Sequence, residues 1–418
     1  MTPVDEPFRW RSIALPALLP TLLFSTGEGA IIPIIPIAAD SLGATLAIAG
    51  LVAGLLTIGE LLGNIPSGWL VARIGERPAM IGATGLAIIG LLACLFAPNP
   101  VVLGAGVLLV GLATAAFGLA RHAFMTSFVP LEYRARSLST LGGIFRLGYF
   151  VGPFISAAII HLTGTAASAF WIHIVMCLGA GIILLVLPDP TASFPSRRTA
   201  GTVPEETRAE EVQVQKNAPG LFQTIYHRRA VLMRLGSGAA LIGALRASRQ
   251  VILPLWALSI GVSDTNTAII IGIAGGVDFA LFYTSGQIMD RFGRLWSALP
   301  SMVGLGLGHL VLAFTHDLDA AVPWFIAAAM LLALANGLGS GILMTLGADL
   351  ADRNNPAPFL GAWRFTSTLG AAAAPLTIAG ITAIASISLA AGVMGVVGFI
   401  GAGLLWRYVP RYAPRVAR

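Results

Sequence analysis

The chain has 418 residues, of which 56% are hydrophobic and only 11% are charged, and its mean hydropathy is +0.84. These values exclude an ordinary soluble domain and make the lipid bilayer the expected solvent of the protein. The net charge is +6, but no cluster of Lys and Arg with interleaved aromatic residues points to nucleic acid as a partner.

Twelve stretches are long and apolar enough to cross a hydrocarbon core of about 30 Å as helices. They are continuously apolar and rich in Ala, Leu and Gly, which is typical of packed membrane helices rather than of the alternating strands of a membrane barrel. The predicted spans are residues 12–38, 44–71, 78–97, 101–124, 139–161, 166–187, 231–260, 266–289, 295–315, 321–348, 358–384 and 386–408.

The basic residues predict the orientation of these spans. The connections on one side, together with both termini, hold 19 of the 25 Lys and Arg residues, and the connections on the other side hold none. By the positive-inside rule, both termini and the long middle loop are cytoplasmic. We therefore expect a multi-pass protein of the cytoplasmic (plasma or inner) membrane.

The chain repeats itself, because an ungapped offset of 218 residues aligns its first half with its second. Matches of Arg with Arg, Pro with Pro and Gly with Gly are unlikely to arise by chance at so many places. They include Arg11 with Arg229, Pro36 with Pro254, Arg73 with Arg291, Arg146 with Arg364 and Gly152 with Gly370. The sequence predicts two bundles of six helices, residues 1–188 and 230–418, joined by a polar linker at 189–229. Duplicated bundles of this kind hold their cargo between the repeats and work by alternating access.

The loop after the second span and its repeat share a motif. The two copies read Gly68-Trp-Leu-Val-Ala72-Arg73-Ile-Gly75-Glu76-Arg77 and Gly286-Gln-Ile-Met-Asp290-Arg291-Phe-Gly293-Arg294. Both resemble the G-x-x-x-D-R-x-G-R loop of the major facilitator superfamily, and span count, duplication and middle loop extend the resemblance over the whole chain. It implies an all-α membrane protein of the major facilitator fold, with these loop residues as a conformational lock. Because Ala72 replaces the family's Asp, the lock in the first copy is expected to be weaker or to use Glu76.

Two further motifs resemble the twelve-span drug:proton antiporters of this superfamily. One is Pro33-Ile-Ile-Pro36, and the other is Gly148-Tyr-Phe-Val-Gly152-Pro153, which matches the core of the antiporter motif G-x-x-x-G-P. The match is partial, since Ser139 stands at the expected upstream Gly and the fourth-span motif R-x-x-Q-G is missing. The resemblance favours export of a lipophilic or amphiphilic small molecule, driven by the proton gradient without a cofactor. The same Pro and Gly residues would equally mark kinks and close packing.

Glu28 in the first span is the sharpest candidate for proton coupling, because an ionisable group at membrane depth is costly and generally faces a cavity or a partner. The repeat offset matches it with Arg246, while Arg249 and Gln250 lie close to Arg246 along the same helix. In the superfamily these helices line the central cavity, so we expect Glu28 to face the two arginines at similar depth. A permanent ion pair that only positions two helices is the alternative. Arginines in the cavity would also admit an anionic or amphiphilic cargo.

A second set of buried charges recurs in both halves. Glu60, with Asn64 beside it, occupies in the second span the position that Asp278 occupies in the eighth, which makes both acids proton-coupling candidates. Arg146 and Arg364 are matched in spans five and eleven. The resemblance places spans two and eleven, and five and eight, side by side. The expected contacts between the halves are therefore Glu60 with Arg364 and Asp278 with Arg146, formed in the outward-open state and broken when the cytoplasmic side opens.

Other polar residues within the spans carry weaker expectations. Asn336 in span ten is a candidate for the cavity wall or for a bond to a neighbouring helix. His173 and His309 are expected to be structural, and Arg121 and Asp349, near cytoplasmic ends, are expected to snorkel toward the interface.

Three other functions are weighed against export, and two of them stay open. An uptake symporter or facilitator for a polar metabolite would use the same fold, and a non-transporting membrane sensor is a further alternative. An enzyme is not expected, because no set of residues suggests a metal site, an activated nucleophile or a phosphate-binding loop. The expected partners are a small-molecule cargo and the lipid bilayer, and a monomer is the usual form in the superfamily.

Overall fold

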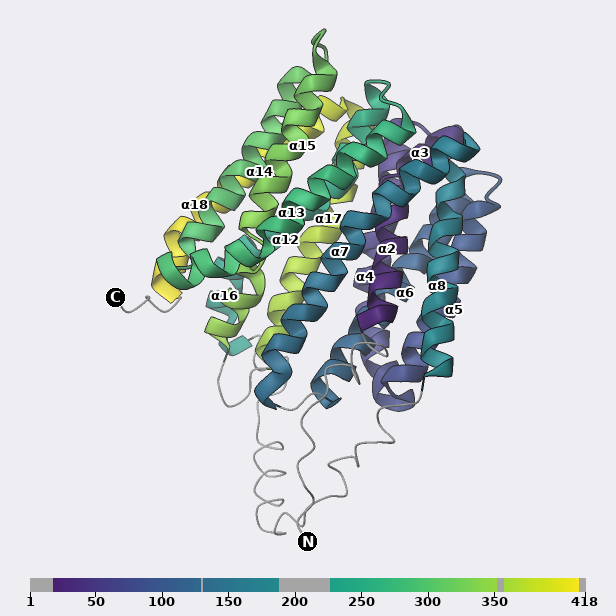
Figure 1. Ribbon diagram of the computed structural model, residues 1–418. Coiled ribbons are helices and arrows are strands. Elements are labelled where there is room, and N and C mark those ends of the chain that lie inside the picture. The colour runs from purple at the N-terminus through teal and green to yellow at the C-terminus, as the bar shows by residue number, and fades with distance from the viewer. Residues whose placement is uncertain (1–17, 129–130, 188–225, 352–356, 413–418) are drawn as a thin grey trace, which may run out of the picture.

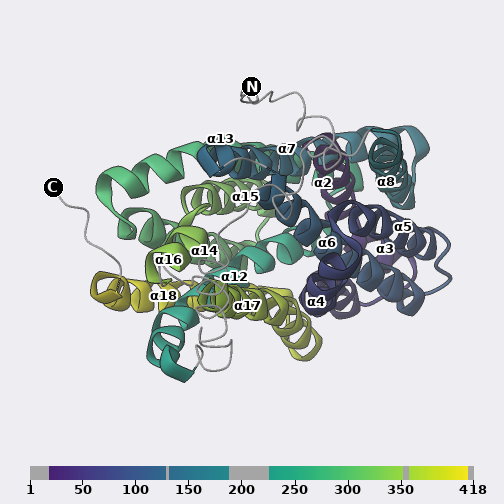
Figure 2. The same ribbon diagram turned by 90° about the horizontal axis from the view of Figure 1, so that it is seen from below.

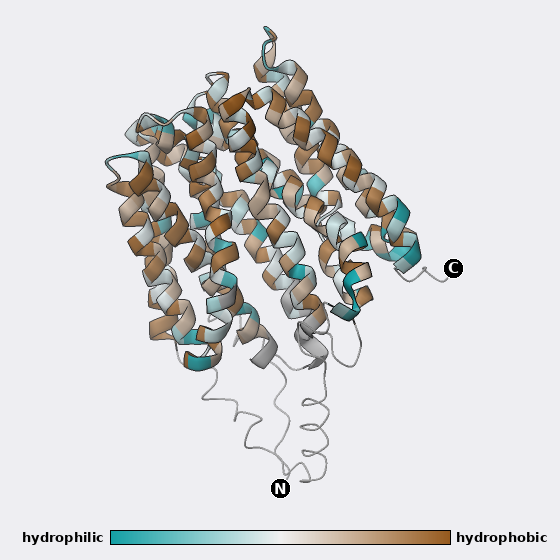
Figure 3. Ribbon diagram, turned by 180° about the vertical axis from the view of Figure 1, so that it is seen from behind, coloured by the Kyte–Doolittle hydropathy of each residue, from teal (hydrophilic) through white to brown (hydrophobic). Residues whose placement is uncertain are grey.

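The computed structural model describes residues 18–128, 131–187, 226–351 and 357–412, and within these ranges every regular element is a helix (Figure 1). Eleven of the described helices are long and apolar enough to cross a membrane, and a bent pair supplies a twelfth span. Figure 3 shows hydrophobic residues along the length of these helices and hydrophilic ones gathered mostly near their ends. The predicted all-α fold with twelve spans is therefore confirmed.

Most helices begin and end within a few residues of the predicted spans; the helix of the fifth span begins eight residues earlier than predicted, and the predicted beginning of the first lies outside the described residues. Those of the first half are α2 (Leu19–Ile31), α3 (Ile35–Ser41), α4 (Leu46–Ile74), α5 (Glu76–Leu95), α6 (Pro100–Phe128), α7 (Leu131–Thr163) and α8 (Ala169–Val186). Those of the second half are α12 (Arg229–Ser259), α13 (Asp264–Phe292), α14 (Leu295–Thr315), α15 (Ala321–Leu338), α16 (Ile342–Leu350), α17 (Ala357–Ile384) and α18 (Ile387–Tyr412). The predicted linker lies almost wholly outside the described residues.

The repeat extends to the residues that begin and end equivalent helices. Thr45 accepts a hydrogen bond from the backbone of α4, and Ser263, at the matching position, does the same for α13. Such caps satisfy backbone N–H groups that a helix leaves unpaired at its start. Gly75 and Gly293, also matched, end these helices with φ values of 88° and 97°, a left-handed conformation that favours glycine.

Two spans are interrupted, the first toward the loop end of its helix pair and the tenth toward the opposite end. The first span bends by 42° between α2 and α3, around Pro33. The tenth is interrupted at residues 339–341, between α15 and α16, a stretch that contains two glycines. Pro254, the repeat partner of Pro36, lies instead inside the unbroken helix α12. A break of this kind frees backbone carbonyl groups that need other partners at membrane depth.

The two halves have the same internal packing. In the first half α2 packs on α7 and α8, α4 on α6, and α5 on α6 and α8; the equivalent helices of the second half make the equivalent contacts. The main contacts between the halves are also a matched pair, α7 with α13 and α4 with α17, which lie side by side in Figure 2. These contacts confirm two pseudo-symmetric bundles of six helices.

The halves pack together at one end of the bundle. We call the end where α8 ends and α12 begins the linker side, and the opposite end the loop side. Toward the loop side a Cβ atom placed on Gly54 would overlap Pro375, and one on Gly276 would lie 2.7 Å from Phe150, so these glycines allow close approach between halves. Toward the linker side Gly68, Gly143, Gly286 and Gly361 face open space, and α7 and α13 splay apart in Figure 1. The structure is therefore closed at the loop side and open toward the linker side.

Candidate functional site

A cavity of about 410 Å³ lies between the two halves at the middle of the bundle. Its walls come from α2, α4 and α7 of the first half and from α12, α13, α15, α16 and α17 of the second. Of the predicted cavity residues, the walls include Arg246, Arg249, Gln250 and Asn336, together with Glu60, Arg146 and Asp278. Glu28 and Asn64 do not line it, although Gly29 does. Most of the charged residues predicted at membrane depth thus meet in one cavity.

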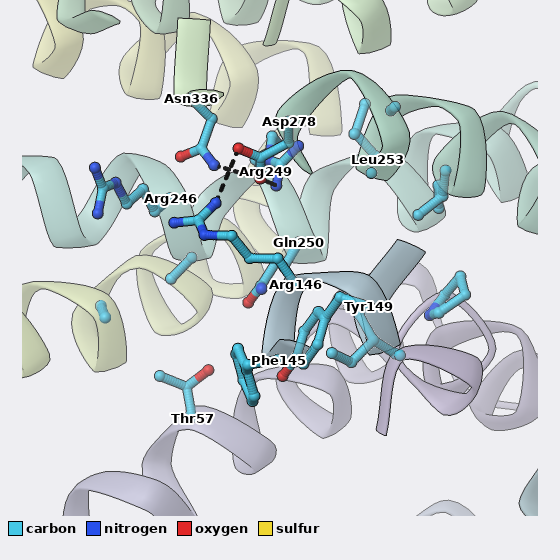
Figure 4. Close-up of a pocket in the computed structure, with 18 of the residues that line it drawn as sticks. Thr57, Phe145, Arg146, Tyr149, Arg246, Arg249, Gln250, Leu253, Asp278 and Asn336 are labelled. Carbon is cyan, nitrogen blue, oxygen red and sulfur yellow. Dashed lines mark hydrogen bonds and ion pairs between the residues drawn. The ribbon is translucent and has the colours of Figure 1, made fainter. Parts of the chain in front are cut away.

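Asp278 of α13 is the centre of a hydrogen-bonded cluster on one wall of the cavity (Figure 4). Its Oδ1 lies 3.2 Å from Nη1 of Arg146, which comes from α7 of the other half. Its Oδ2 lies 3.3 Å from Nη2 of Arg249 and accepts a hydrogen bond of 2.8 Å from Nδ2 of Asn336. Arg146 also lies over the ring of Phe282, with 4.7 Å between its Cζ and the ring centroid. The expected contact between Asp278 and Arg146 is thus present, and two further donors saturate the same carboxylate.

The pair is formed in a structure that is packed at the loop side and open toward the linker side. Its separation when the cytoplasmic side opens stays a prediction.

Arg246 has a different environment from Arg249. Its Nη2 donates a short hydrogen bond to the carbonyl oxygen of Gly339, at the break after α15, which also accepts one of 3.1 Å from the backbone N–H of Ile342. The Nε atoms of both Arg246 and Arg249 are buried and have no hydrogen-bond partner among the described residues. Arg246 is therefore held by a neutral carbonyl group, and within the described chain no carboxylate forms an ion pair with it.

Glu28 lies in α2, is fully buried, and does not face the two arginines of α12. The polar side chains around its carboxyl group are Tyr149 of α7 and two residues of α6, Thr114 and the cation Arg121. The hydroxyl groups of Tyr149 and Thr114 lie near the carboxylate, but neither of its oxygens makes a hydrogen bond of full geometry within the described part of the chain. The expected pairing of Glu28 with Arg246 and Arg249 is therefore wrong. The rotation of α2 turns the carboxyl group into the first half, behind the cavity wall formed by Gly29 and Tyr149.

Arg121 of α6 was expected to snorkel toward the interface and points inward instead. It does not extend to the interface; its guanidinium lies over the ring of Phe145, with 4.6 Å between Cζ and the ring centroid, and its Nε is buried. The signal that could have identified it is its place inside the predicted fourth span rather than beyond its end. A long side chain near a span end can point inward as well as outward, and the sequence alone does not decide between the two.

Glu60 and Arg364 are not joined as expected. Glu60 lines the cavity from α4, and Arg364 acts on it only through space, as do Arg121 and Glu28. No ion pair within 4.0 Å links Glu60 to Arg364 in the residues that the structure describes, and Arg364 is exposed. Arg364 lies only seven residues from the first residue of α17, whereas Glu60 lies at the middle of α4, so a difference in depth separates them. Asn64, one turn from Glu60, does not bridge that gap.

The two motif loops are each tied to their own half. Arg77 donates hydrogen bonds to backbone carbonyls at the end of α8, including one of 2.6 Å from Nε to the oxygen of Leu184. Arg294 forms a bidentate ion pair with Asp349 of α16, with N–O distances of 2.8 and 3.3 Å. Asp349 was expected to snorkel and is instead the main partner of this loop. Asp290 is exposed and lies 3.6 Å from Arg294. The lock function of Gly68, Arg73, Gly75, Gly286, Arg291 and Gly293 remains a prediction.

The antiporter-like segment is a packing site in this structure. Cβ atoms placed on Gly148 and Gly152 would overlap the backbone of α2 near Thr26, and one on Gly29 would lie 2.8 Å from Tyr149. Gly370, the repeat partner of Gly152, makes the same approach to Ala240 of α12. The glycines before Pro153 therefore serve close helix packing, the alternative that the sequence left open.

The comparisons with known proteins agree on the family. The sequence model of the Major Facilitator Superfamily matches residues 17–355 and 235–418. YncC of Bacillus subtilis (strain 168), which is named as a metabolite transport protein, is 26% identical over 391 residues, covering 80% of this chain and 82% of its own length. The galactose-proton symporter of Escherichia coli (strain K12) is 25% identical over 182 residues, 44% of this chain and 39% of that protein. A crystal structure of a D-xylose-proton symporter superposes with a TM-score of 0.73, at 15% identity, over 97% of this chain and 98% of that one.

These relatives are transporters of small molecules, so the expectation of a transporter rather than an enzyme is confirmed. The resemblance to the drug:proton antiporters receives no support from them. The matched regions extend across both bundles and the cavity between them, and the chain belongs to the Major Facilitator Superfamily.

Proposed function

We propose that the protein takes up a small polar metabolite together with protons by alternating access. The observation that carries this proposal is Glu28, a fully buried carboxyl group without a hydrogen-bond partner among the described residues, placed directly behind the cavity wall. Tyr149 both lines the cavity and acts on Glu28, so it connects the two sites. The named activities of the relatives support uptake of a metabolite over the export that the partial antiporter motif favoured.

A buried carboxyl group of this kind is suited to carry a proton. Its protonation state depends on the balance between desolvation, which favours the neutral form, and a nearby cation, which favours the charged form. Arg121 is that cation here, and it is not in contact with Glu28 in this state. A small movement of α2 relative to α6 would bring Arg121 closer or take it away, and would thereby drive release or uptake of a proton.

The cavity supplies the second half of the mechanism. It lies between bundles that are packed at the loop side and open toward the linker side, so a rocking motion of one bundle against the other would expose it to the two sides in turn. We take the linker side as cytoplasmic, as the basic residues indicate. The state described is then the one that releases its cargo into the cell.

The direction of coupling can be measured in proteoliposomes with an imposed pH gradient, using radiolabelled xylose, galactose, benzoate and succinate. A symporter accumulates its cargo when the outside is acidic, whereas an antiporter accumulates it when the lumen is acidic. We expect accumulation with the acidic exterior. Accumulation only with the acidic lumen would instead support export.

Glu28→Gln is the decisive variant, because it keeps the size of the side chain and removes the exchangeable proton. We expect it to lose accumulation driven by the pH gradient and to keep exchange of labelled for unlabelled cargo, which needs no net proton movement. Asp40→Asn, a matched change at an exposed position of the same bent span, serves as the control and should retain both activities. If Glu28→Gln still accumulates cargo with the same dependence on pH, Glu28 does not carry the coupled proton.

A further inference from the structure

The charges that line the cavity do not balance. Three guanidinium groups, those of Arg146, Arg246 and Arg249, face it, and Asp278 is the acid that pairs with two of them. Glu60 also lines the cavity, on the opposite wall, but forms no ion pair with any of the three in the described structure. Even with both acids ionised, the lining carries an excess of positive charge.

The excess is concentrated on Arg246. Its hydrogen-bond partner is the neutral carbonyl of Gly339, so its charge has no counter-ion at contact distance among the described residues. A guanidinium group at membrane depth is costly without a partner of opposite charge. Arg249, one turn along α12, is on the same side of the cavity and shares its single acid with Arg146. A ligand that brings a negative charge to Arg246 and Arg249 would compensate this cost.

Both guanidinium side chains are accessible from the cavity. Arg246 and Arg249 line it and are half-buried, and 14% of the Arg249 side chain stays exposed. Guanidinium groups bind carboxylates through parallel N–H···O bonds, and such charge-assisted bonds are about twice as strong as neutral ones. A neutral sugar would leave the excess positive charge at Arg246 uncompensated. The chemistry of this wall therefore selects for an anion.

Apolar and aromatic side chains line another part of the cavity. Phe145 and Tyr149 of α7 lie apart from the cluster around Asp278, Phe279 contributes another ring to the lining, and Leu253 lies on the side of α12 (Figure 4). A volume of about 410 Å³ is at the lower end of small-molecule sites. Such a wall stabilises the hydrocarbon body of a ligand, which favours an organic carboxylate over a free phosphate ion.

We infer that the cavity binds a small organic carboxylate, with Arg246 and Arg249 holding the carboxylate group and the aromatic residues of α7 contacting its hydrocarbon body. This inference rests on the proposed function in that it names the class of metabolite carried. The negative charge of the cargo also gives cotransport with protons an electrical benefit, because each proton carried offsets the charge of the anion.

Binding to the purified full-length protein in detergent tests the inference without any need for proton coupling. The probe is radiolabelled benzoate at neutral pH, where it is an anion, and its neutral analogues benzyl alcohol and benzamide serve as competitors of the same shape. Succinate, inorganic phosphate and xylose complete the panel. We expect benzoate or succinate to bind and to raise the thermal unfolding temperature, and the neutral analogues to compete at least about tenfold more weakly.

Variants of α12 locate the bound carboxylate. Arg246→Gln should weaken benzoate or succinate binding by at least about tenfold, Arg246→Lys should weaken it less, and Arg249→Gln should give an independent loss. Arg234→Gln is the matched control, because Arg234 lies on the same helix, is outside the cavity, and binds Tyr412 at the surface. Should Arg246→Gln fold poorly, Arg246→Lys and Arg249→Gln still carry the test.

Several outcomes would overturn the inference. They are tighter binding of xylose or benzyl alcohol than of either carboxylate, binding of phosphate alone, no binding of any anion, or equal binding by Arg234→Gln and Arg246→Gln. Proton-driven uptake of xylose without anion binding would refute the inference and leave the proposed function standing. Anion binding without any effect of a pH gradient on uptake would support the inference and refute proton coupling.

Discussion

The two halves of the molecule bring equivalent positions together and place different chemistry there. Glu28 of α2 is acted on by Arg121 of α6, and the repeat offset of 218 carries these positions to Arg246 of α12 and Gly339 at the end of α15. Arg246 indeed donates a hydrogen bond to the carbonyl of Gly339. The two halves therefore bring equivalent positions of equivalent helices together but have different residues at these positions. The first half has an acid beside a cation, whereas the second has a cation beside a backbone carbonyl.

The two buried acids differ in the same way. Glu28 has no hydrogen-bond partner among the described residues, while Asp278 has three donors, one of them from the other half. A carboxyl group without partners loses little when it gains a proton, whereas a saturated carboxylate would lose three interactions. Under the proposed function, proton exchange belongs to the first half and a fixed charge to the second, and the following measurements can break or sharpen this contrast.

The largest expected effect comes from the acids themselves. Asp278→Asn should lower the free energy of unfolding by about 3 kcal/mol, because it leaves Arg146 and Arg249 without a counter-ion. This value is at the low end for a broken buried ion pair, because the cavity admits solvent. Glu28→Gln should change it by about 1 kcal/mol or less, because no hydrogen bond is lost. Unfolding by SDS in mixed micelles gives both values. Equal losses for the two variants would contradict the assignment of different roles.

Close packing is expected to be equally strict in both halves. Gly152→Ala and Gly370→Ala should each cost about 2 kcal/mol, because the added Cβ would overlap the backbone of α2 or of α12 and force the helices apart. Gly143→Ala on α7 is the control, since its Cβ would face open space and should be neutral or slightly stabilising. Thermal unfolding of the four proteins, wild type included, tests this. A tolerated alanine at Gly152 alone would show that the halves differ in packing as well as in charge.

The buried histidines give a smaller contrast. His309 accepts a hydrogen bond of 2.7 Å from Ser248 and donates one of 2.8 Å to the carbonyl of Leu305, so His309→Leu should cost about 1–2 kcal/mol. His173 packs edge-on against Phe24, and neither ring nitrogen has a partner in the described structure, so His173→Leu should be close to neutral. The same unfolding experiment compares the two. A larger loss at His173 than at His309 would point to a polar role for His173.

The ion pair of the second motif loop should give the smallest effect. A double-mutant cycle with Arg294→Gln and Asp349→Asn should yield a coupling energy of about 1 kcal/mol, since the pair is two-pronged but partly exposed. Such a cycle isolates the pair from the other contacts of Arg294. A coupling near zero would leave the loop without an energetic tie to α16.

The sequence predicted the fold closely because its main features follow from patterns along the chain. Hydropathy determined the spans, and the repeat offset identified which helices are equivalent. The contact between Asp278 and Arg146 was also predictable, because both residues lie at the middle of adjoining helices. Each of these inferences needs only the position of a residue along a helix, which the chain length fixes at 1.5 Å per residue.

The errors concern the rotation of helices and the direction of long side chains. Glu28 and Arg246 are equivalent by the repeat, yet α2 turns Glu28 away from the cavity while α12 turns Arg246 toward it. Arg121 was assigned to the interface because its distance from the span end allows it to point either way. Glu60 and Arg364 failed to meet because their depths differ. The packing between helices determines helix rotation, side-chain direction and depth. The pattern of a single sequence does not predict this packing.

The central ion pair has a mechanical consequence. Arg146 and Asp278 each lie at the midpoint of their helix, so the bond that joins the two halves lies halfway between the loop side and the linker side. When a rigid body rotates, the displacement of an atom grows with its distance from the rotation axis. If the bundles tilt about this point, the ends of α7 and α13 sweep through large arcs while the two charges barely move. The ion pair then lies on the rotation axis and is kept through the whole cycle. The opening and closing of each side take place at the ends of the helices.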